Sequence, residues 1–280
     1  MNKIEILILL SIFLPLLAAF LNVFFKKNEN LRDLLTLLIS ILTFGCVVNI
    51  FLQRQNLPEY SFKIFDIMPG LSISFSVENL GLLFALIASS LWIVTHTYAI
   101  GYMRKNNEKN RLRFFSFFSL SIATVMGISF SDNLFTLFIF YEILTLSTFP
   151  LVAHKGTKEA LGGAKKYLSI LIGTSVAFQL FAIIWIFSIA GTLDFKVGGI
   201  LTGKTEPYIV GILLALFCFG VGKAALMPFH GWLPAAMVAP TPVSALLHAV
   251  AVVKAGVFTI LKVGIFIFGI DWLEETSAAD

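Results

Sequence analysis

Continuous apolar runs of about 20 residues recur along this chain and constrain its fold more than any other feature. One of them, LFTLFIFYEILTLSTFPLV from Leu134 to Val152, contains a single carboxylate, that of Glu142. A run of this length crosses the hydrocarbon core of a bilayer as an α-helix. Membrane β-barrels alternate apolar and polar residues, whereas these runs are continuously apolar. The sequence therefore predicts an all-α polytopic membrane protein.

Composition leaves no room for a water-soluble domain. Of the 280 residues, 58% are hydrophobic and 13% are charged, whereas soluble proteins carry about 25% charged residues. Most of the basic residues fall in short loops between the apolar runs, where they set the topology. We therefore expect the lipid bilayer, and no nucleic acid, as a partner.

We expect about eight membrane-spanning helices, near residues 4–25, 31–52, 79–102, 112–130, 133–153, 164–190, 208–237 and 243–268. Residues 53–77 contain Pro58, Pro69 and Gly70 and are expected to form an outer loop with short extended pieces.

Lys and Arg residues are distributed unevenly between the two sides of the membrane. Twelve lie in the loops after the first, third and fifth runs, namely Lys26, Lys27, Arg32, Arg104, Lys105, Lys109, Arg111, Arg113, Lys155, Lys158, Lys165 and Lys166. Five lie on the other side, namely Lys3, Arg54, Lys63, Lys196 and Lys204. Because basic residues accumulate in cytoplasmic loops, we expect a multi-pass protein of the cell (inner) membrane with its N-terminus outside.

Glu142 is the acid that we expect near the middle of the membrane. Asp132 opens the same run, and at 1.5 Å per residue Glu142 lies about 15 Å deeper. A charge at that depth costs roughly 3 kcal/mol on insertion scales, so the carboxyl group needs a partner, water or a proton. The alternative is a neutral glutamic acid that only ties helices together through a hydrogen bond.

The seventh run supplies a candidate partner for Glu142. Lys223 lies deep in the run and is followed by Pro228, which removes a backbone hydrogen bond beside it. Gly222 and Pro234 weaken the same region. We therefore expect an interrupted helix, a feature that marks ion or substrate sites in membranes.

The eighth run adds His248 and Lys254 to the candidate set. Lys262 lies nearer the outer end, where its long side chain is able to reach the interface, and His230 lies beside the expected break. We keep Asp132, His230 and Lys262 as further relay or proton-uptake positions. The sequence shows no cluster of His, Cys and Asp for a metal and no histidine pair at one depth for haem, so we expect neither metal nor cofactor. Titratable groups at membrane depth are typical of proton relays.

The stretches that carry these residues resemble the antiporter-like subunit family. They are SDNLFTLFIFYEILTLSTFPLV, GGAKKYL and GKAALMPFHGWLPAAMVAPTPVSALLHAVAVVKAGVF, and the resemblance covers residues 80–270. The family includes proton-pumping membrane subunits of complex I, Mrp-type antiporters and related membrane hydrogenases. The resemblance implies that Glu142 pairs with Lys223 of a broken helix, and that His248 and Lys254 carry protons onward.

The same resemblance implies a domain organisation. It assigns residues 1–110 to an N-terminal three-helix segment, 111–270 to the first of two inverted five-helix repeats, and 271–280 to a truncated outer loop. The second repeat is missing, so we expect a fragment of a longer subunit, with a second chain as the alternative.

Three functions follow as hypotheses. The first is an ion-translocating subunit of a multi-subunit monovalent cation/proton antiporter, similar to the Mrp D-type subunit, with other membrane subunits, H⁺ and either Na⁺ or K⁺ as partners. The second is a proton-pumping subunit of an NADH:quinone oxidoreductase or membrane hydrogenase, which makes the chain at most the non-redox part of an enzyme. The third is a structural membrane subunit without transport.

Overall fold

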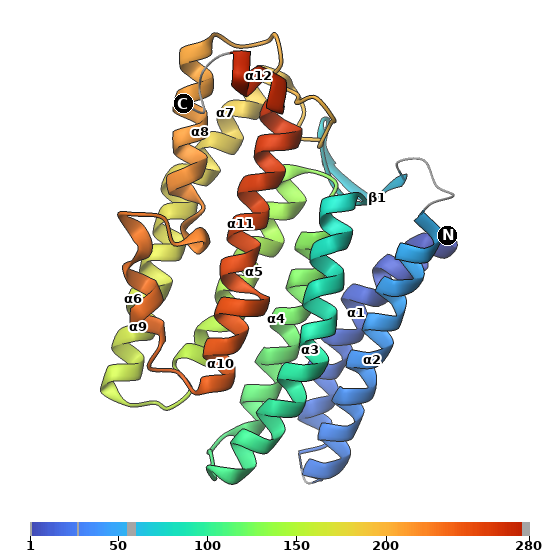
Figure 1. The fold of residues 1–280 in the computed structure, drawn as a ribbon, viewed down its shortest axis with the longest axis vertical. Coiled ribbons are helices and arrows are strands. Elements are labelled where there is room, and N and C mark those ends of the chain that lie inside the picture. The colour runs from blue at the N-terminus through green and yellow to red at the C-terminus, as the bar shows by residue number, and fades with distance from the viewer. Residues whose placement is uncertain (1, 27, 55–59, 276–280) are drawn as a thin grey trace.

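Long helices run side by side through the molecule and account for most of its mass (Figure 1). The computed structural model describes residues 2–26, 28–54 and 60–275, with the side chain of Ala249 left out. The helices and strands in chain order are α1 Lys3–Phe24, α2 Glu29–Gln53, β1 Tyr60–Met68, β2 Leu71–Val77, α3 Asn79–Lys105, α4 Arg111–Ser129, α5 Leu134–Val152, α6 Lys158–Thr174, η2 Ser175–Leu180, α7 Phe181–Ala190, α8 Pro207–Gly220, η3 Gly222–Ala224, η4 Phe229–Gly231, α9 Trp232–Ala236, α10 Thr241–Ala245, η5 Leu246–Val250, α11 Val252–Val263, η6 Gly264–Phe268 and α12 Ile270–Glu275.

The predicted spans agree with these helices to within a few residues. In the described part of the chain, seven continuous helical stretches are long and apolar enough to cross a membrane, and the shorter apolar helix α8 begins the seventh predicted span. The sixth span begins at Lys158 rather than near residue 164, because the side chain of Thr157 caps the helix by accepting from the amide of Ala160. Residues 271–275 form part of helix α12 rather than a loop, and residues 276–280 lie outside the described residues.

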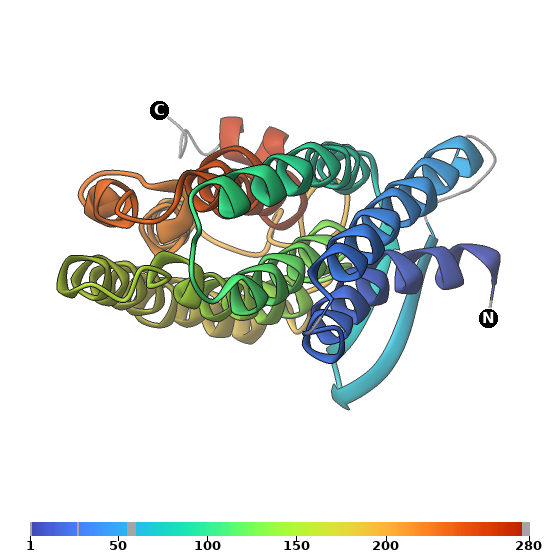
Figure 2. The same cartoon turned by 90° about the horizontal axis from the view of Figure 1, so that it is seen from below.

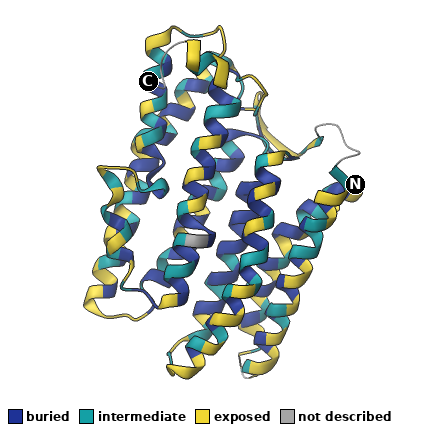
Figure 3. Ribbon diagram, in the orientation of Figure 1, coloured by how far each residue is buried: buried dark blue, intermediate teal, exposed yellow. Residues whose placement is uncertain are grey.

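The bundle is built around α4. In the most apolar stretch of α4, 72% of the residues are buried, whereas in that of α2 only 33% are buried. Helix α4 is therefore central, and α2 lies at the edge. Helices α1 and α2 pack together at one side, and Figure 2 shows them at the far end from α8 and α9. Figure 3 shows the burial that results, with buried residues facing the centre of the bundle and exposed residues on its outer faces.

The predicted outer loop contains an antiparallel hairpin. Strands β1 and β2 pair with Tyr60 opposite Val77, and Gly70, with φ of +80°, makes the turn. β2 lies over the ends of α4 and α5, where the amide of Ser76 donates to the carbonyl of Phe130 (2.8 Å). Asn133, the N-cap of α5, donates its side-chain amide to the carbonyl of Ser72 (2.8 Å). The hairpin therefore fixes the start of the helix that carries Glu142.

The connections alternate between the two ends of the bundle. Those after α1, α3 and α5 lie at the lower end in Figure 1, and the hairpin and residues 191–206 lie at the upper end. This is the alternation that consecutive membrane crossings require.

Candidate functional site

The seventh span is interrupted, as the sequence predicts. Helix α8 ends at Gly220, and α-helix resumes only at Trp232. Two 3₁₀ turns lie between them, and Ala225 adopts a left-handed conformation with φ of +55°. The interruption thus begins at Val221, two residues before Lys223 and upstream of Pro228, the residue expected to cause it.

Glycines allow the interrupted segment to lie against its neighbours. A Cβ at Gly220 would lie 2.5 Å from the backbone nitrogen of Gln179, and one at Gly222 would lie 2.3 Å from Oγ1 of Thr174. On the opposite side, a Cβ at Gly256 of α11 would lie 2.3 Å from the backbone nitrogen of Ala224. The segment is therefore held between the α6–η2 helix and α11 at contact distances that only glycine permits.

Lys223 is fully buried within this segment. Its ammonium donates to the carbonyl oxygen of Tyr141 (2.7 Å) and to Oγ1 of Thr145 (2.6 Å). The same Nζ lies 3.0 Å from the centroid of the Tyr141 ring, an arrangement that stabilises a cation. The backbone amide of Lys223 also donates to the hydroxyl of Tyr141 (3.2 Å).

Glu142 lies on the same turn of α5, but it makes no ion pair with Lys223 within 4.0 Å among the contacts of the described residues. Its Oε1 atom is buried without a hydrogen-bond partner in that part of the chain. The direct Glu142–Lys223 pair implied by the family resemblance is therefore absent from this conformation. The reason is geometric, because Tyr141 and Thr145, on either side of Glu142 in the helix, already receive the ammonium.

Among the contacts of the described residues, no hydrogen bond or ion pair joins the other predicted relay residues to Lys223. His248 is half-buried in the π-helical turn η5, and its Nε2 has no partner among the described residues. Lys254 is exposed on α11, on the face that also exposes Val257 and Leu261. His230 and Pro228 are exposed in the interrupted segment, whereas Pro234, expected to weaken the helix, is exposed within α9, where the α-helix has resumed.

Lys262 differs most from its expected position. Rather than reaching the interface, it is fully buried, pairs with Oε1 of Glu78 (2.5 Å) and donates to the carbonyl oxygen of Ser131 (2.5 Å). Sequence reasoning missed Glu78, which immediately precedes α3. The sequence signal that could have identified Glu78 is its position just before a helix N-terminus, where a carboxylate is favoured. At that position Glu78 faces the outer end of the eighth span.

Asp132 lies close to this pair, just before the N-cap of α5. It lines a hollow of about 510 Å³ together with Glu78, Asp194, Arg54 and Lys63. Burial raises the pKa of Asp132, and hydrogen bonds from Ser76 and Ser74 oppose that effect. Burial also raises the pKa of Glu78, against the attraction of Lys262.

The comparisons with known proteins agree with the predicted family. Residues 131–275 match the family described as NADH:quinone oxidoreductase/Mrp antiporter, TM, and residues 68–115 match NADH-Ubiquinone oxidoreductase (complex I), chain 5 N-terminus. One Na(+)/H(+) antiporter subunit, from Alkalihalophilus pseudofirmus, is 32% identical over 203 residues, which are 70% of this chain and 25% of that protein. The chain spans about a quarter to a third of the length of the curated relatives it matches.

Two solved membrane complexes contain chains with the same fold. One is the membrane-bound sulfane sulfur reductase (MBS), an archaeal respiratory membrane complex. A chain of that complex superposes on this chain with a TM-score of 0.81 at 23% sequence identity, and the match covers 97% of this chain and 56% of that chain. The other is the Mrp complex from Dietzia sp. DQ12-45-1b, with a TM-score of 0.80 at 21% identity over 98% of this chain and 29% of that chain. Because the first family match covers more than half of the 280 residues, this chain belongs to the membrane-subunit family shared by NADH:quinone oxidoreductases and Mrp antiporters.

Proposed function

We propose that this chain is the ion-translocating part of a membrane subunit in a multi-subunit monovalent cation/proton antiporter, and that Glu142, Lys223, His248 and Lys254 move protons within it. The observation that carries the proposal is the fully buried ammonium of Lys223, which lies in an interrupted helix. Beside it is the carboxyl group of Glu142, whose buried Oε1 has no hydrogen-bond partner among the residues that the structure describes. A purely structural lysine in a membrane would be expected to pair with that carboxylate, because an unpaired buried charge is costly.

The proposed mechanism has two positions for the ammonium. In the position observed here, Lys223 is held by the carbonyl of Tyr141 and the hydroxyl of Thr145. In the second position, it pairs with Glu142, whose negative charge favours retention of the proton. Movement between the positions changes how tightly Lys223 holds its proton, so the lysine accepts a proton in one and passes it on from the other.

The later steps need groups outside the Lys223 cluster. We propose that His248 receives the proton at its Nε2, which has no hydrogen-bond partner in the described part of the chain, and that Lys254 carries it to the exposed face of α11. A charged lysine at membrane depth needs protein or water against it, so this face meets a further part of the subunit or another membrane chain. Asp132, Lys262 and His230 remain secondary candidates, and residues 111–270 remain the proposed translocating unit.

The test uses everted membrane vesicles that carry the intact complex, with a dye that reports internal pH. After the interior has been acidified, addition of Na⁺ or K⁺ should raise internal pH in the wild type. Glu142→Gln should reduce that response at least tenfold. The matched control, Glu159→Gln, removes an exposed carboxylate at the start of α6 and should leave the response unchanged.

A second candidate is supported by the family match, whose description includes NADH:quinone oxidoreductase. If wild-type vesicles do not respond to either cation but still acidify on NADH, the chain is part of a redox-driven proton pump. If Glu142→Gln and Lys223→Ala both assemble and leave ion movement unchanged, neither transport function holds and the chain is structural.

A further inference from the structure

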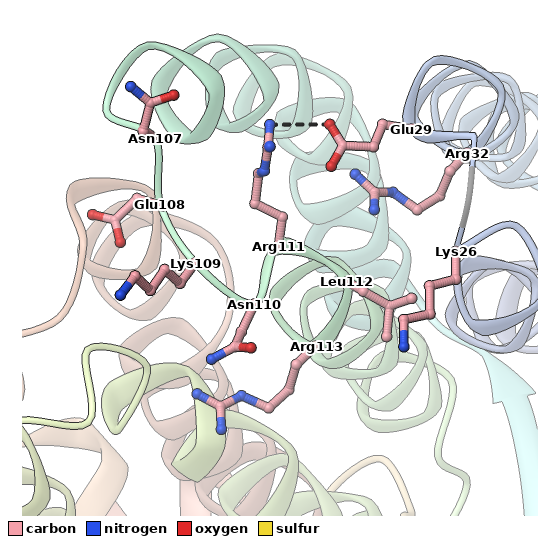
Figure 4. Close-up of a pocket in the computed structure, with 10 residues that line it drawn as sticks. All are labelled: Lys26, Glu29, Arg32, Asn107, Glu108, Lys109, Asn110, Arg111, Leu112 and Arg113. Carbon is pink, nitrogen blue, oxygen red and sulfur yellow. Dashed lines mark ion pairs between the residues drawn. The ribbon is translucent and has the colours of Figure 1, made fainter.

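A basic hollow lies at the lower end of the bundle in Figure 1, away from the interrupted helix. Its volume is about 670 Å³, and it is formed where the α1–α2 connection meets the α3–α4 connection. Figure 4 shows ten residues that line it: Lys26, Glu29, Arg32, Asn107, Glu108, Lys109, Asn110, Arg111, Leu112 and Arg113. Five of these side chains are cations and two are anions, so the lining has an excess of positive charge.

The anions of the hollow leave several cations without a carboxylate. Glu29 pairs with Arg111 (3.1 Å), while Glu108 lies 3.8 Å from Nε2 of His154. Neither Lys26 nor Lys109 has an ion pair within 4.0 Å among the described residues.

The hollow also has a rigid, charged wall. Arg32 is 3% exposed and is fixed by Asp33 (2.9 Å), whose other oxygen binds Arg104 (2.5 Å). Because the single carboxylate of Asp33 is shared between Arg32 and Arg104, this side of the hollow keeps a net positive charge. A buried guanidinium in a fixed position distinguishes this hollow from a scatter of surface lysines that serve only to set topology.

Helix α4 begins in the hollow with an unusual charge arrangement. Its N-cap residue, Asn110, makes no side-chain cap, and its first turn contains no acid but includes Arg111 and Arg113. The first amides of a helix have no intrahelical partner and carry partial positive charge, so basic residues there are unfavourable unless an anion is present. An oxyanion at this position would accept from the free amides and supply a negative charge beside Arg113, whose guanidinium otherwise donates only to the carbonyl of His154 (3.1 Å) among the contacts of the described residues. Arg111 is already paired with Glu29.

The surroundings indicate where that anion comes from. Phe24, two residues before Lys26, is 80% exposed at the end of α1, and Leu34 is 53% exposed on α2, so both helices that lead into the hollow also expose apolar side chains. An anionic headgroup and an acyl chain fit these two adjoining surfaces, and basic pockets between membrane helices bind such lipids.

We propose that this hollow binds the phosphate headgroup of an anionic membrane phospholipid, with the phosphate at the N-terminus of α4 between Lys26, Lys109 and Arg113. The acyl chains lie along α1 and α2. The site is independent of the proposed proton relay, because none of the proposed relay residues lines it.

The test measures lipid binding to the intact complex purified in mild detergent. Dioleoyl phosphatidylglycerol should be retained in native mass spectra and should raise the unfolding temperature more than dioleoyl phosphatidylcholine. The double substitution Lys26→Gln, Lys109→Gln should weaken phosphatidylglycerol binding by about fivefold for each charge removed. The control, Lys155→Gln with Lys158→Gln, removes two exposed lysines at the same end that do not line the hollow, and it should leave binding unchanged.

Three results would overturn the proposal. The first is phosphatidylglycerol binding that is as tight in the Lys26, Lys109 variant as in the wild type. The second is equal protection by millimolar inorganic phosphate alone, which would make the ligand a free anion rather than a lipid. The third is loss of a partner subunit from the complex of that variant without a change in bound lipid, which would identify the hollow as a protein–protein interface.

Discussion

Thr145 is the residue whose role is most open to a direct test. Its hydroxyl is one of two acceptors for the ammonium of Lys223 (2.6 Å), and a hydrogen bond to a charged group contributes about 1.5–3 kcal/mol. Thr145→Val keeps the shape of the side chain and removes the acceptor. We expect the ammonium to favour Glu142 and the antiport rate to fall about tenfold.

The control for this change lies one turn further along α5. Thr148 bonds the hydroxyl of Tyr167 (2.6 Å) rather than Lys223, so Thr148→Val should affect stability more than transport. Equal rates for Thr145→Val and the wild type, measured in the same vesicles, would show that the hydroxyl does not position the lysine.

The Glu78–Lys262 pair predicts a non-additive effect on stability. Glu78→Gln leaves the ammonium of Lys262 buried without a counter-charge, which typically costs about 3–5 kcal/mol. Combining it with Lys262→Met removes the buried charge and should restore most of the lost unfolding temperature. Thermal unfolding of the two single variants and the double variant in detergent measures this coupling, and additive losses would contradict it.

Asp132 predicts a pH dependence of stability. Because burial raises its pKa, the folded protein binds this proton more tightly than the unfolded chain. The resulting stabilisation is present below about pH 4 and is lost as pH rises through the raised pKa. Asp132→Asn, which cannot ionise, should therefore gain unfolding temperature relative to the wild type as pH increases from 4 to 7. A constant difference across this range would show that the carboxyl group is not perturbed.

At the scale of elements, the contact between α11 and the interrupted segment is the most sensitive. A Cβ at Gly256 would lie 2.3 Å from the backbone nitrogen of Ala224, so Gly256→Ala must displace the segment that holds Lys223. We expect at least a tenfold loss of antiport, because misplacement by about 1 Å disrupts a positioned site. Gly173→Ala in α6 meets nothing within 4 Å and should leave activity and assembly unchanged, in the same vesicle assay.

Most elements of the fold could be predicted from the sequence because lipid imposes one rule on every apolar run, which must satisfy its backbone hydrogen bonds as a helix. The burial of Lys223 could be predicted from its place far inside an apolar run, and the interruption beside it from glycine and proline positions. The position of Lys254 relative to His248 could not, because His248 lies within the π turn Leu246–Val250 and Lys254 follows that turn on α11. Such a turn changes the rotation per residue, so angles calculated for a regular α-helix no longer apply.

Glu78 was missed for a different reason. Its partner, Lys262, lies on a helix far away in the sequence, and only the packing of α3 against α11 brings the two side chains together. The observed position of the ammonium of Lys223, on the carbonyl of Tyr141 and the hydroxyl of Thr145, was missed for a similar reason. It depends on how the interrupted segment packs against α5, which residue types alone do not reveal.

At the scale of the whole molecule, the unequal distribution of basic residues predicts which end faces the cytoplasm. After replacement of Cys46 and Cys218 by serine, Lys109→Cys should react with a membrane-impermeant maleimide only in everted vesicles. Lys204→Cys, at the other end, should react in intact cells. Labelling in the reverse pattern would place the N-terminus inside and contradict the predicted orientation.

The continuous helix Lys158–Ala190 has 33 residues, which corresponds to a length of about 50 Å at 1.5 Å per residue. A bilayer core of about 30 Å accommodates a helix of that length when the helix tilts or its ends project, and the tilt depends on membrane thickness. The same helix presents the backbone of Gln179 to Gly220, the last residue before the interruption. A change in membrane thickness that altered the tilt of this helix would therefore reach the interrupted helix through the contact of Gln179 with Gly220.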